Sequence, residues 1–232
     1  MMTLERDVSY GHNLRMISTV TADIADPSRF VTRYGDAIRA YLRALIPNSH
    51  DADEVEQEFL LRVIERGFPD GQGRRGPFRY YLMTSVRNAA LGYFRKSQRR
   101  PMNVADLSLI PAAEIADREW NRKWRECVLK NAWMALRQHE QRNPGNLCHT
   151  VLRTSVKHPE EDSKMLAVRV YSLTGQEMTP EAFRKQLSRA RRRFGDLIVQ
   201  EVSRTLSSAT EETIDEELQS LDLLKYVRVP ND

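Results

Sequence analysis

The chain has 232 residues, of which 41% are hydrophobic and 29% charged, and its formal net charge is +4. These values are ordinary for a soluble globular protein, and the length allows one sizeable core or two small ones. No apolar run approaches the roughly 20 residues that a membrane-spanning helix needs, and no export signal is evident. With only two cysteines, Cys127 and Cys148, we expect a cytoplasmic protein with reduced thiols and no membrane insertion.

The charges are sharply segregated along the chain. Between residues 74 and 100 there are eight Arg or Lys residues and no Asp or Glu. Between residues 207 and 224 there are six acidic residues and no basic one. A basic segment of this kind indicates a polyanionic partner.

The first two predicted elements are helices. Nearly every periodic segment of the chain has helical spacing and no alternating strand pattern is evident, so we predict an all-α fold. Asp26 is suited to cap the first helix and Pro27 to occupy its first position, where a missing N–H costs nothing. We expect Asp51 or Asp53 to open the second helix and Gly67 to end it. The residues expected to face inward are Phe30, Tyr34, Ile38, Tyr41, Leu42, Leu45, Val55, Phe59, Val63 and Ile64.

A third helix is predicted from Pro77 to about Lys96, after a basic, glycine-rich turn. At about 100° per residue, one face is apolar enough for a core. It carries Phe78, Leu82, Ser85, Val86, Ala89 and Tyr93. The opposite face carries Tyr80, Met83, Arg87, Leu91 and Phe94. Apolar and aromatic residues mixed with Arg on this second face predict a surface that is buried only when a partner binds.

The chain then changes in character. Prolines, small residues and acidic residues with weak periodicity predict a linker over 101–117. It joins two small helical domains, at 26–100 and 118–206. They are flanked by an N-terminal segment without a motif, 1–25, and an acidic C-terminal extension, 207–232. Four helices are expected in the second domain. The first has an inward-facing stripe of Trp120, Trp124, Cys127, Val128, Ala132 or Asn131, and Leu136.

The last helix of the second domain contains FRKQLSRARRRF, residues 183–194, with six basic residues among twelve. Its core-facing stripe is Phe183, Leu187, Ala190, Phe194, Leu197 and Ile198. The cations on the other side repel one another, and we expect no Glu four residues away to compensate them, so that an anion would relieve the repulsion. The structural alternative is a solvated amphipathic helix.

A shorter helix and a turn precede this basic helix, in the order of a helix-turn-helix. Gly175 ends the shorter helix, and Thr179 with Pro180 starts the basic one. Because the N-terminal part of the second helix enters the major groove in such motifs, we predict that Arg184 and Lys185 meet base edges or phosphates. The other predicted DNA-binding residues of the motif are Thr179, Ser188, Arg189 and Arg192, the last three for the backbone.

Patterns for catalysis or metal binding are weak. The carboxylates of residues 51–58 lie at a helix start, where acids suit the helix dipole, and no His joins them. A zinc site would need Cys127, His139, Cys148 and His149. These four lack the close pairing of zinc ligands, so ordinary buried cysteines are favoured. We therefore expect no enzyme, no cofactor and no metal site.

Over about residues 30–100 and 120–206, the chain resembles the extracytoplasmic-function (ECF) group of bacterial RNA polymerase sigma factors. DADEVEQEFLLRV is similar to the acidic "QE-hydrophobic" helix of that family. GPFRYYLMTSVRNAALGYFRKSQRR is similar to its FRxWLxxxxRNxxxDxxR helix, with Gly92 in place of the Asp. FRKQLSRARRRF is similar to its VKxRLxRARxxL recognition helix. The order and spacing of the three motifs together carry the resemblance.

The resemblance implies a non-enzymatic initiation subunit whose partners are core RNA polymerase and promoter DNA. The first domain would bind the clamp helices of the polymerase and melt the minus-ten element. The second would bind the flap and recognise the minus-thirty-five element. An anti-sigma factor or another regulator would be a further partner. By position, the residues at or near the clamp are Asp53, Glu54, Gln57 and Glu58.

The resemblance places the minus-ten strand on the basic aromatic helix and the turn before it. A single strand is held by cations along its backbone and by aromatic rings under its bases. The residues assigned to this strand are Arg74, Arg75, Tyr80, Arg87, Asn88, Phe94, Arg95 and Lys96. Structural alternatives exist for each type. Tyr80 and Phe94 could pack on a neighbouring helix. Arg87 and Asn88 could form an internal polar pair, and the other basic residues could be solvated.

A helix-turn-helix regulator that never touches polymerase would explain the basic helix equally well. It would not readily explain the first domain, whose acidic helix and basic aromatic helix occur in the order of the sigma family.

The C-terminal extension is predicted to form an amphipathic acidic helix. It has Ile214, Leu218, Leu221 and Leu224 at helical spacing. Thr213 and Glu216 form a candidate capping box. We expect the helix to dock on the chain's own helices or on a regulator, and one version of this hypothesis has it shield the basic face as a mimic of DNA. The alternative is a solubilising tail.

Overall fold

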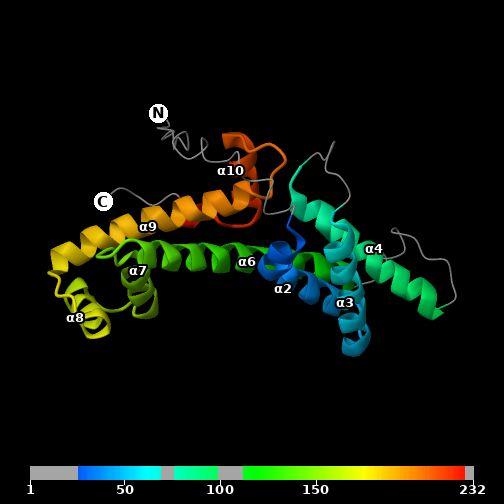
Figure 1. Ribbon diagram of the computed structural model, residues 1–232, viewed down its shortest axis with the longest axis horizontal. Helices are drawn as coiled ribbons and strands as arrows, with labels where there is room; N and C mark the ends of the chain where they lie inside the picture. The colour runs from blue at the N-terminus through cyan, green and yellow to red at the C-terminus, as the bar shows by residue number, and fades with distance from the viewer. Residues whose placement is uncertain (1–25, 69–75, 99–111, 228–232) are drawn as a thin grey trace, which may run out of the picture. The chain divides into compact units, whose positions relative to one another are not determined.

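The computed structural model describes residues 26–68, 76–98 and 112–227. Over these residues it contains nine helices and no strand, which confirms the all-α prediction (Figure 1). The N-terminal segment 1–25 and residues 101–111 of the predicted linker lie outside the described residues. No helix in the described ranges is both long and apolar enough to span a bilayer.

The helices are α2 (Pro27–Leu45), α3 (Ser49–Arg66), α4 (Phe78–Gln98), α6 (Ala112–Arg142), α7 (Cys148–Lys157), α8 (Ser163–Thr174), α9 (Pro180–Ser203), α10 (Glu211–Ser220) and α11 (Leu224–Val227). They belong to two compact units, each formed by two stretches of the described chain. The first unit contains residues 26–128 and 202–222, and the second contains residues 129–201 and 223–227. Residues 112–117, at the end of the predicted linker, are helical. The predicted domain boundaries rest on sequence pattern and stay a prediction.

The ends of the first helices follow from their capping residues. The Asp26 carboxylate accepts hydrogen bonds from two backbone N–H groups, those of Ser28 at 3.0 Å and Arg29 at 3.2 Å, as predicted. The expected start of α3 at Asp51 or Asp53 is wrong. Asn48 caps this helix by accepting from the His50 N–H at 2.9 Å, because a capping side chain is already available there, ahead of the acidic residues.

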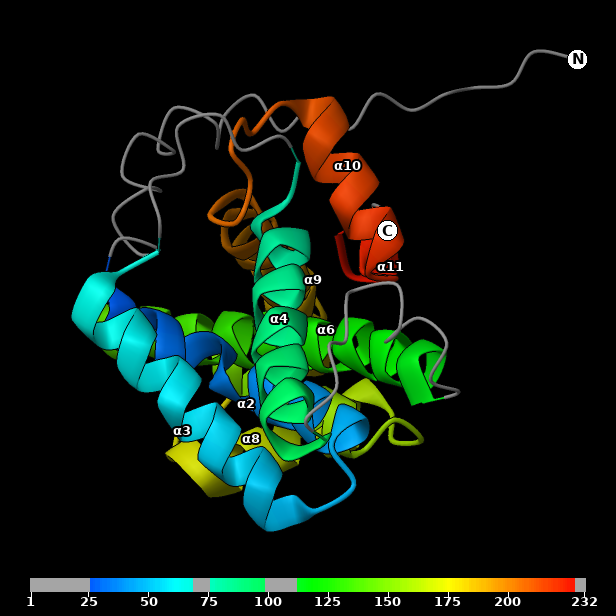
Figure 2. The same cartoon turned by 90° about the vertical axis from the view of Figure 1, so that its right-hand side faces the viewer.

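The core of the first unit is rich in aromatic residues from α2, α4 and α6. Phe30 of α2 meets Phe78 of α4 edge to face, with ring centroids 5.4 Å apart. Tyr34 of α2 stacks on Trp124 of α6 at 4.3 Å. Such pairs add to the stabilisation from area burial alone. Helices α2, α3 and α4 pack against one another, and Figure 2 shows them together.

Two expectations about inward-facing residues in the first unit are wrong. Ile64 is 48% exposed, because it lies about 100° from Val63 and so falls off the buried stripe of α3. On α4, Leu91 and Phe94 of the predicted partner-dependent face are buried in the core. Packing against both α2 and α3 buries a broad arc of α4, so this face is largely internal.

The acidic extension packs within the first unit. Ile214, Leu218 and Leu221 are all buried, as predicted, and the alternative of a solubilising tail is wrong. Leu224, the last residue of the predicted stripe, is not part of this helix, because α10 ends at Ser220 and Leu224 begins α11. The capping box is formed by Thr210 and Thr213 instead of Thr213 and Glu216, with the Thr213 N–H donating to Thr210 Oγ1 at 3.2 Å. Thr210 caps because it lies in extended backbone just ahead of the apolar stripe.

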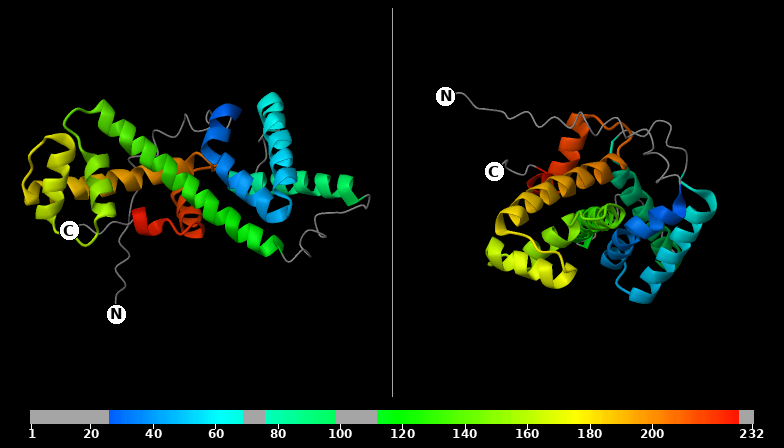
Figure 3. Two further views of the ribbon diagram at one scale, coloured as in Figure 1. Left: turned by 90° about the horizontal axis from the view of Figure 1, so that it is seen from below. Right: turned by 60° about the vertical axis from the view of Figure 1, so that its left-hand side comes forward.

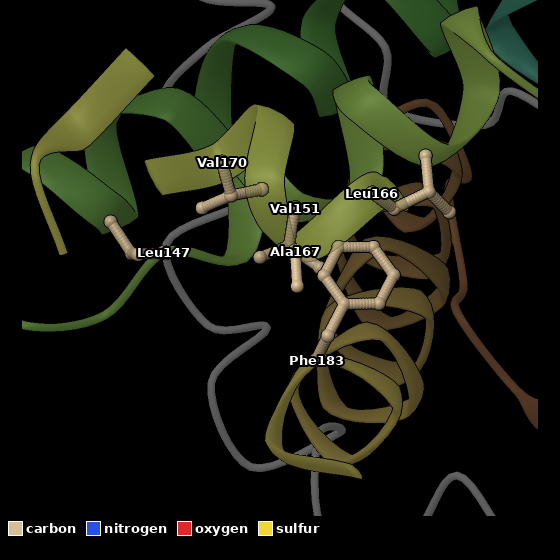
Figure 4. Packing of buried hydrophobic residues seen from close by; sticks show 6 residues of the cluster. All are labelled: Leu147, Val151, Leu166, Ala167, Val170 and Phe183. Carbon is tan, nitrogen blue, oxygen red and sulfur yellow. The ribbon is translucent and has the colours of Figure 1, made fainter. Parts of the chain in front are cut away.

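The second unit is built around α7, α8 and the basic helix α9, which Figure 3 shows from two sides. A buried cluster joins the three helices and the turn before α7. It consists of Leu147, Val151, Leu166, Ala167, Val170 and Phe183. Figure 4 shows the Phe183 ring of α9 pointing into this cluster. The start of the predicted core stripe of α9, Phe183 with Leu187, therefore fixes this helix to α7 and α8.

The short C-terminal helix α11 lies against α9 in the second unit. A Cβ placed on Gly195 of α9 would lie 3.1 Å from the backbone oxygen of Tyr226 and 3.3 Å from Cα of Val227. Glycine at this position therefore permits a close backbone approach between the two helices.

Candidate functional site

The helix-turn-helix is formed by α8, a short turn and α9. Asp162 caps α8 by accepting from the N–H groups of Lys164 and Met165, at 3.0 and 2.8 Å. Gly175 ends it in the left-handed region, with φ 70°. Thr179 Oγ1 then accepts from the Ala182 N–H at 3.1 Å and starts α9. The predicted stop at Gly175 and start at Thr179 are confirmed.

The side of α9 that faces away from the core is cationic. Its exposed residues include Arg184, Lys185, Ser188, Arg189, Arg191 and Arg192. The expectation that no Glu compensates these cations is wrong for Lys185. Glu181 lies four residues before Lys185, and their charged atoms are 2.8 Å apart. Both side chains are largely exposed, so this pair is worth little. Arg184 Nη1 donates to Ser163 Oγ of α8 at 2.8 Å, which orients it at the start of the basic helix.

The residues of α4 assigned to single-stranded DNA divide into exposed and internal ones. Tyr80 is 47% exposed, and Asn88, Arg95 and Lys96 are exposed as well. Phe94 is only 9% exposed and packs in the core. Arg74 and Arg75 lie outside the described residues. Among the described residues of this set, those open to a nucleic acid are therefore Tyr80, Asn88, Arg95 and Lys96.

Arg87 belongs to an internal polar network of the first unit. Its Nε donates to the Tyr41 hydroxyl at 3.0 Å, and its Nη2 donates to Asp117 Oδ1 of α6 at 2.6 Å. Tyr41 donates to the same carboxylate oxygen at 2.9 Å. Burial raises the pKa of Tyr41, and the hydrogen bond to Asp117 raises it as well, against the lowering effect of Arg87. The phenol is therefore neutral, and Arg87 takes an internal partner in Asp117 of α6.

Arg79, which the sequence interpretation missed, is the most deeply buried cation of α4. It is 1% exposed and forms two hydrogen bonds of 2.9 Å to the two carboxylate oxygens of Glu217 on α10, itself 2% exposed. Ser220 Oγ accepts another at 3.0 Å, and Asn121 of α6 also accepts from this guanidinium. Burial lowers the pKa of Arg79, but the hydrogen bonds and charge of Glu217 more than offset it, so the pKa is raised.

The sequence carried a signal for this pair that went unused. At about 100° per residue, Arg79 lies between Val86 and Ala90 on the buried arc that begins at Phe78 and Leu82. Glu217 likewise lies between Leu221 and Leu224 on the predicted apolar stripe of the extension. A charge on a core-facing stripe needs a partner of opposite sign, so each of the two positions predicts a buried partner.

The outer face of α3 carries the residues assigned to polymerase. Glu54, Gln57 and Glu58 are exposed. Asp53 hydrogen-bonds to Arg43 of α2 at 2.9 to 3.1 Å. The sequence interpretation missed that Leu61, like Ile64, is exposed beside these residues, so the face combines acidic and apolar groups.

Both cysteines are buried and free of a disulfide, which fits ordinary core residues. Among the residues that the structure describes, no group of three or more His, Cys, Asp or Glu side chains could hold a metal ion.

Comparison with protein families gives a match within the first unit. Residues 30–100 match Sigma-70 region 2, which includes α2, α3 and α4. This match supports a sigma factor role in RNA polymerase binding and promoter recognition. Sigma factors are not a catalytic family. The match ends before the helix-turn-helix, and no curated protein or solved structure gives a significant match to the chain.

Proposed function

We propose that this chain is a sigma factor of the ECF group, which binds core RNA polymerase and directs promoter recognition, DNA melting and transcription initiation. The observation that carries the proposal is the order of its parts. A sigma-70 region 2 match at residues 30–100 is followed by a helix-turn-helix whose second helix exposes a basic face. Such a protein acts in the cytoplasm, where its polymerase is, and needs no cofactor.

The polymerase contact is proposed on the outer face of α3, against the clamp helices. Glu54, Gln57 and Glu58 supply the acidic and polar groups, with Asp53 at the edge of the face. A neighbouring apolar residue, Leu61, is 56% exposed, and an exposed apolar group within a polar surface favours a protein partner. The flap would be the contact of the second domain.

Minus-ten binding is proposed on the exposed part of α4. Tyr80 offers a ring for an unpaired base, and Arg95 and Lys96 offer cations for the phosphate backbone. Arg74 and Arg75, just before the helix, would extend this basic surface. Phe94 and Arg87 would support it from the core side, while Asn88 lies on the exposed side.

Minus-thirty-five recognition is proposed for α9. Arg184 and Lys185 lie near the N-terminus of this helix, where side chains of a helix-turn-helix reach base edges. Ser188, Arg189 and Arg192 would contact the DNA backbone, and Thr179, at the start of the helix, is a further proposed DNA-binding residue. If phosphate contacts dominate, binding should weaken steeply with salt, and Arg189→Ala should reduce the slope of log affinity against log salt by about 1.

The second candidate is a stand-alone helix-turn-helix regulator, favoured by the exposed basic face of α9. A regulator should bind duplex promoter DNA alone, whereas a sigma factor of this kind should need core polymerase. An anti-sigma factor or another regulator remains a proposed partner in either case.

The test is retention of the full-length protein on immobilised bacterial core RNA polymerase. We expect the intact protein to be retained and the double variant Gln57→Ala, Glu58→Ala to be retained less. The matched control is Gln176→Ala, Glu177→Ala, which changes the same exposed pair of residue types in the turn of the second unit. No retention of the intact protein, with duplex DNA still bound, would establish the stand-alone regulator instead.

A further inference from the structure

Tyr80, the exposed ring of α4, rests on a guanidinium that the acidic extension holds in place. The guanidinium carbon of Arg79 lies over the Tyr80 ring, 4.2 Å from its centroid. Tyr80 as a whole residue is still 47% exposed, so a large part of it is open to solvent. A cation over one side of an aromatic ring is attracted by the ring quadrupole and limits its motion. Tyr80 is therefore an exposed ring whose support comes from the interior.

Glu217 of α10 keeps Arg79 against this ring. Its two carboxylate oxygens accept from Arg79 Nε and Nη2, both at 2.9 Å, and this two-bond geometry fixes the plane of the guanidinium. Both side chains are almost fully buried. Without the carboxylate, the buried charge of Arg79 would be uncompensated, and the guanidinium would have to turn toward water and leave the ring.

Helix α10 is built into the first unit as a permanent element. Ile214, Leu218 and Leu221 are buried there, and a capping box at Thr210 fixes the start of the helix. Just before it, the carbonyl of Thr205 accepts from the Phe78 N–H at 2.8 Å, next to the start of α4. The extension therefore holds the residues around Tyr80 through backbone and side-chain contacts alike.

We propose that Glu217 is a positioning residue for single-stranded DNA, and that the acidic C-terminal helix is an integral part of the minus-ten surface. Glu217 holds Arg79 against one side of the Tyr80 ring. The ring is thereby fixed as a platform, and an unpaired base stacks on its other side. This inference rests on the proposed function. A platform held in its bound geometry loses less conformational freedom on binding, and this raises affinity without a direct contact to DNA.

The hypothesis that the acidic extension shields the basic face as a mimic of DNA predicts the opposite effect of Glu217 on DNA binding. A shield would have to leave α4 before DNA binds, and removing the Glu217 charge would then help binding. The burial of the apolar stripe and of both members of the ion pair favours a fixed support over a shield that detaches.

The test compares Glu217→Gln with Glu216→Gln in the full-length protein. Glu216 lies on the same helix but is exposed, so its variant loses the same charge without touching Arg79. The probe is a fluorescein-labelled single-stranded DNA pool of randomised sequence, about 12 nucleotides long. Its binding is measured by anisotropy with protein bound to core polymerase, and core alone is the blank.

We expect Tyr80→Ala to weaken binding of the pool by roughly fivefold to a hundredfold, the range that one base–aromatic stack is worth. Glu217→Gln should weaken it several-fold, and Glu216→Gln should leave it unchanged. In the Tyr80→Ala background, Glu217→Gln should have no further effect. That last result separates positioning of the ring from general loosening, which would lower binding in both backgrounds.

Each remaining outcome overturns a different step. If Tyr80→Ala has no effect, the proposed minus-ten surface is wrong and this inference falls with it. If Tyr80→Ala weakens binding but the two Glu variants behave alike, the minus-ten surface stands and the role of Glu217 is refuted. Stronger binding by Glu217→Gln would establish a shield instead.

A second variant keeps the test decisive if Glu217→Gln does not fold. Glu217→Asp keeps the charge and shortens the side chain, so it should weaken binding by a smaller factor. This loss should again vanish in the Tyr80→Ala background. An equal loss in both backgrounds would refute the proposal.

Discussion

The packing of α10 makes a direct prediction about the stability of the first unit. Leu218 lies on the buried stripe of α10 and is fully buried, whereas the next residue, Gln219, is exposed. Leu218→Ala should therefore destabilise the unit that contains region 2, although Leu218 lies far beyond residue 100 in the sequence. Gln219→Ala is the matched control on the same helix.

The size of the effect follows from the burial of Leu218. Truncating a fully buried Leu to Ala costs about 2 to 5 kcal/mol, from lost transfer free energy and from the cavity that remains. With a urea dependence of about 2 kcal/mol per molar, the middle of the usual range, the unfolding midpoint should fall by about 1 to 2.5 M. An exposed substitution such as Gln219→Ala should stay within about 0.5 kcal/mol.

The assay is urea unfolding of the full-length protein, followed by tryptophan fluorescence. Trp120 and Trp124 lie in the first unit, and Trp133 lies in the second. A Trp133→Phe background therefore makes the fluorescence specific for the first unit. Equal midpoints for Leu218→Ala and Gln219→Ala would refute the conclusion that the extension stabilises the region 2 unit.

Further predictions concern glycine and histidine. Gly195→Ala should displace α11 and destabilise the second unit by about 1 to 3 kcal/mol, because its Cβ would lie 3.1 Å from the Tyr226 backbone oxygen. Gly92→Ala, in the interior of α4 with nothing within 4 Å of its Cβ, should instead stabilise by about 0.5 to 1 kcal/mol; thermal melts of both variants check the contrast. Burial lowers the pKa of His149 below 6.5, so protonation favours the unfolded chain. The second unit should be fully stable above pH 6.5 and lose stability as the pH falls through the lowered pKa. His149→Gln should reduce this loss in melts at pH 7.5 and about 5.5.

Local signals in the sequence were sufficient for most helix ends. Asp26 before Pro27, Gly175 after α8, and Thr179 before Pro180 each act through their own backbone geometry and their nearest neighbours. Capping residues mispredicted a helix start where several candidate caps lie close together in the sequence, as at the start of α3. The helix-turn-helix could therefore be predicted from sequence alone.

Long-range packing could not be predicted in the same way. Whether Phe94 of α4 faces a partner or the core depends on which helices lie beside α4, and periodicity does not contain that information. The pairing of Arg79 with Glu217 joins residues 138 positions apart. Each charge lies on an apolar stripe, so a partner was required, but the sequence does not say which of the carboxylates supplies it.

The cations of α4 therefore have two different tasks. Arg79 is neutralised by Glu217 and Arg87 by Asp117, both from within the first unit. Breaking a buried ion pair costs about 3 to 5 kcal/mol, so turning Arg79 toward a phosphate would cost more than one exposed contact returns. We therefore expect a nucleic acid on this helix to be held by the exposed cations Arg95 and Lys96; Lys96 lies 4.0 Å from Glu58 in an exposed pair that is worth little. Substitution of Arg79 should consequently act on folding and ring position, while substitution of Lys96 should act on the salt dependence of DNA binding.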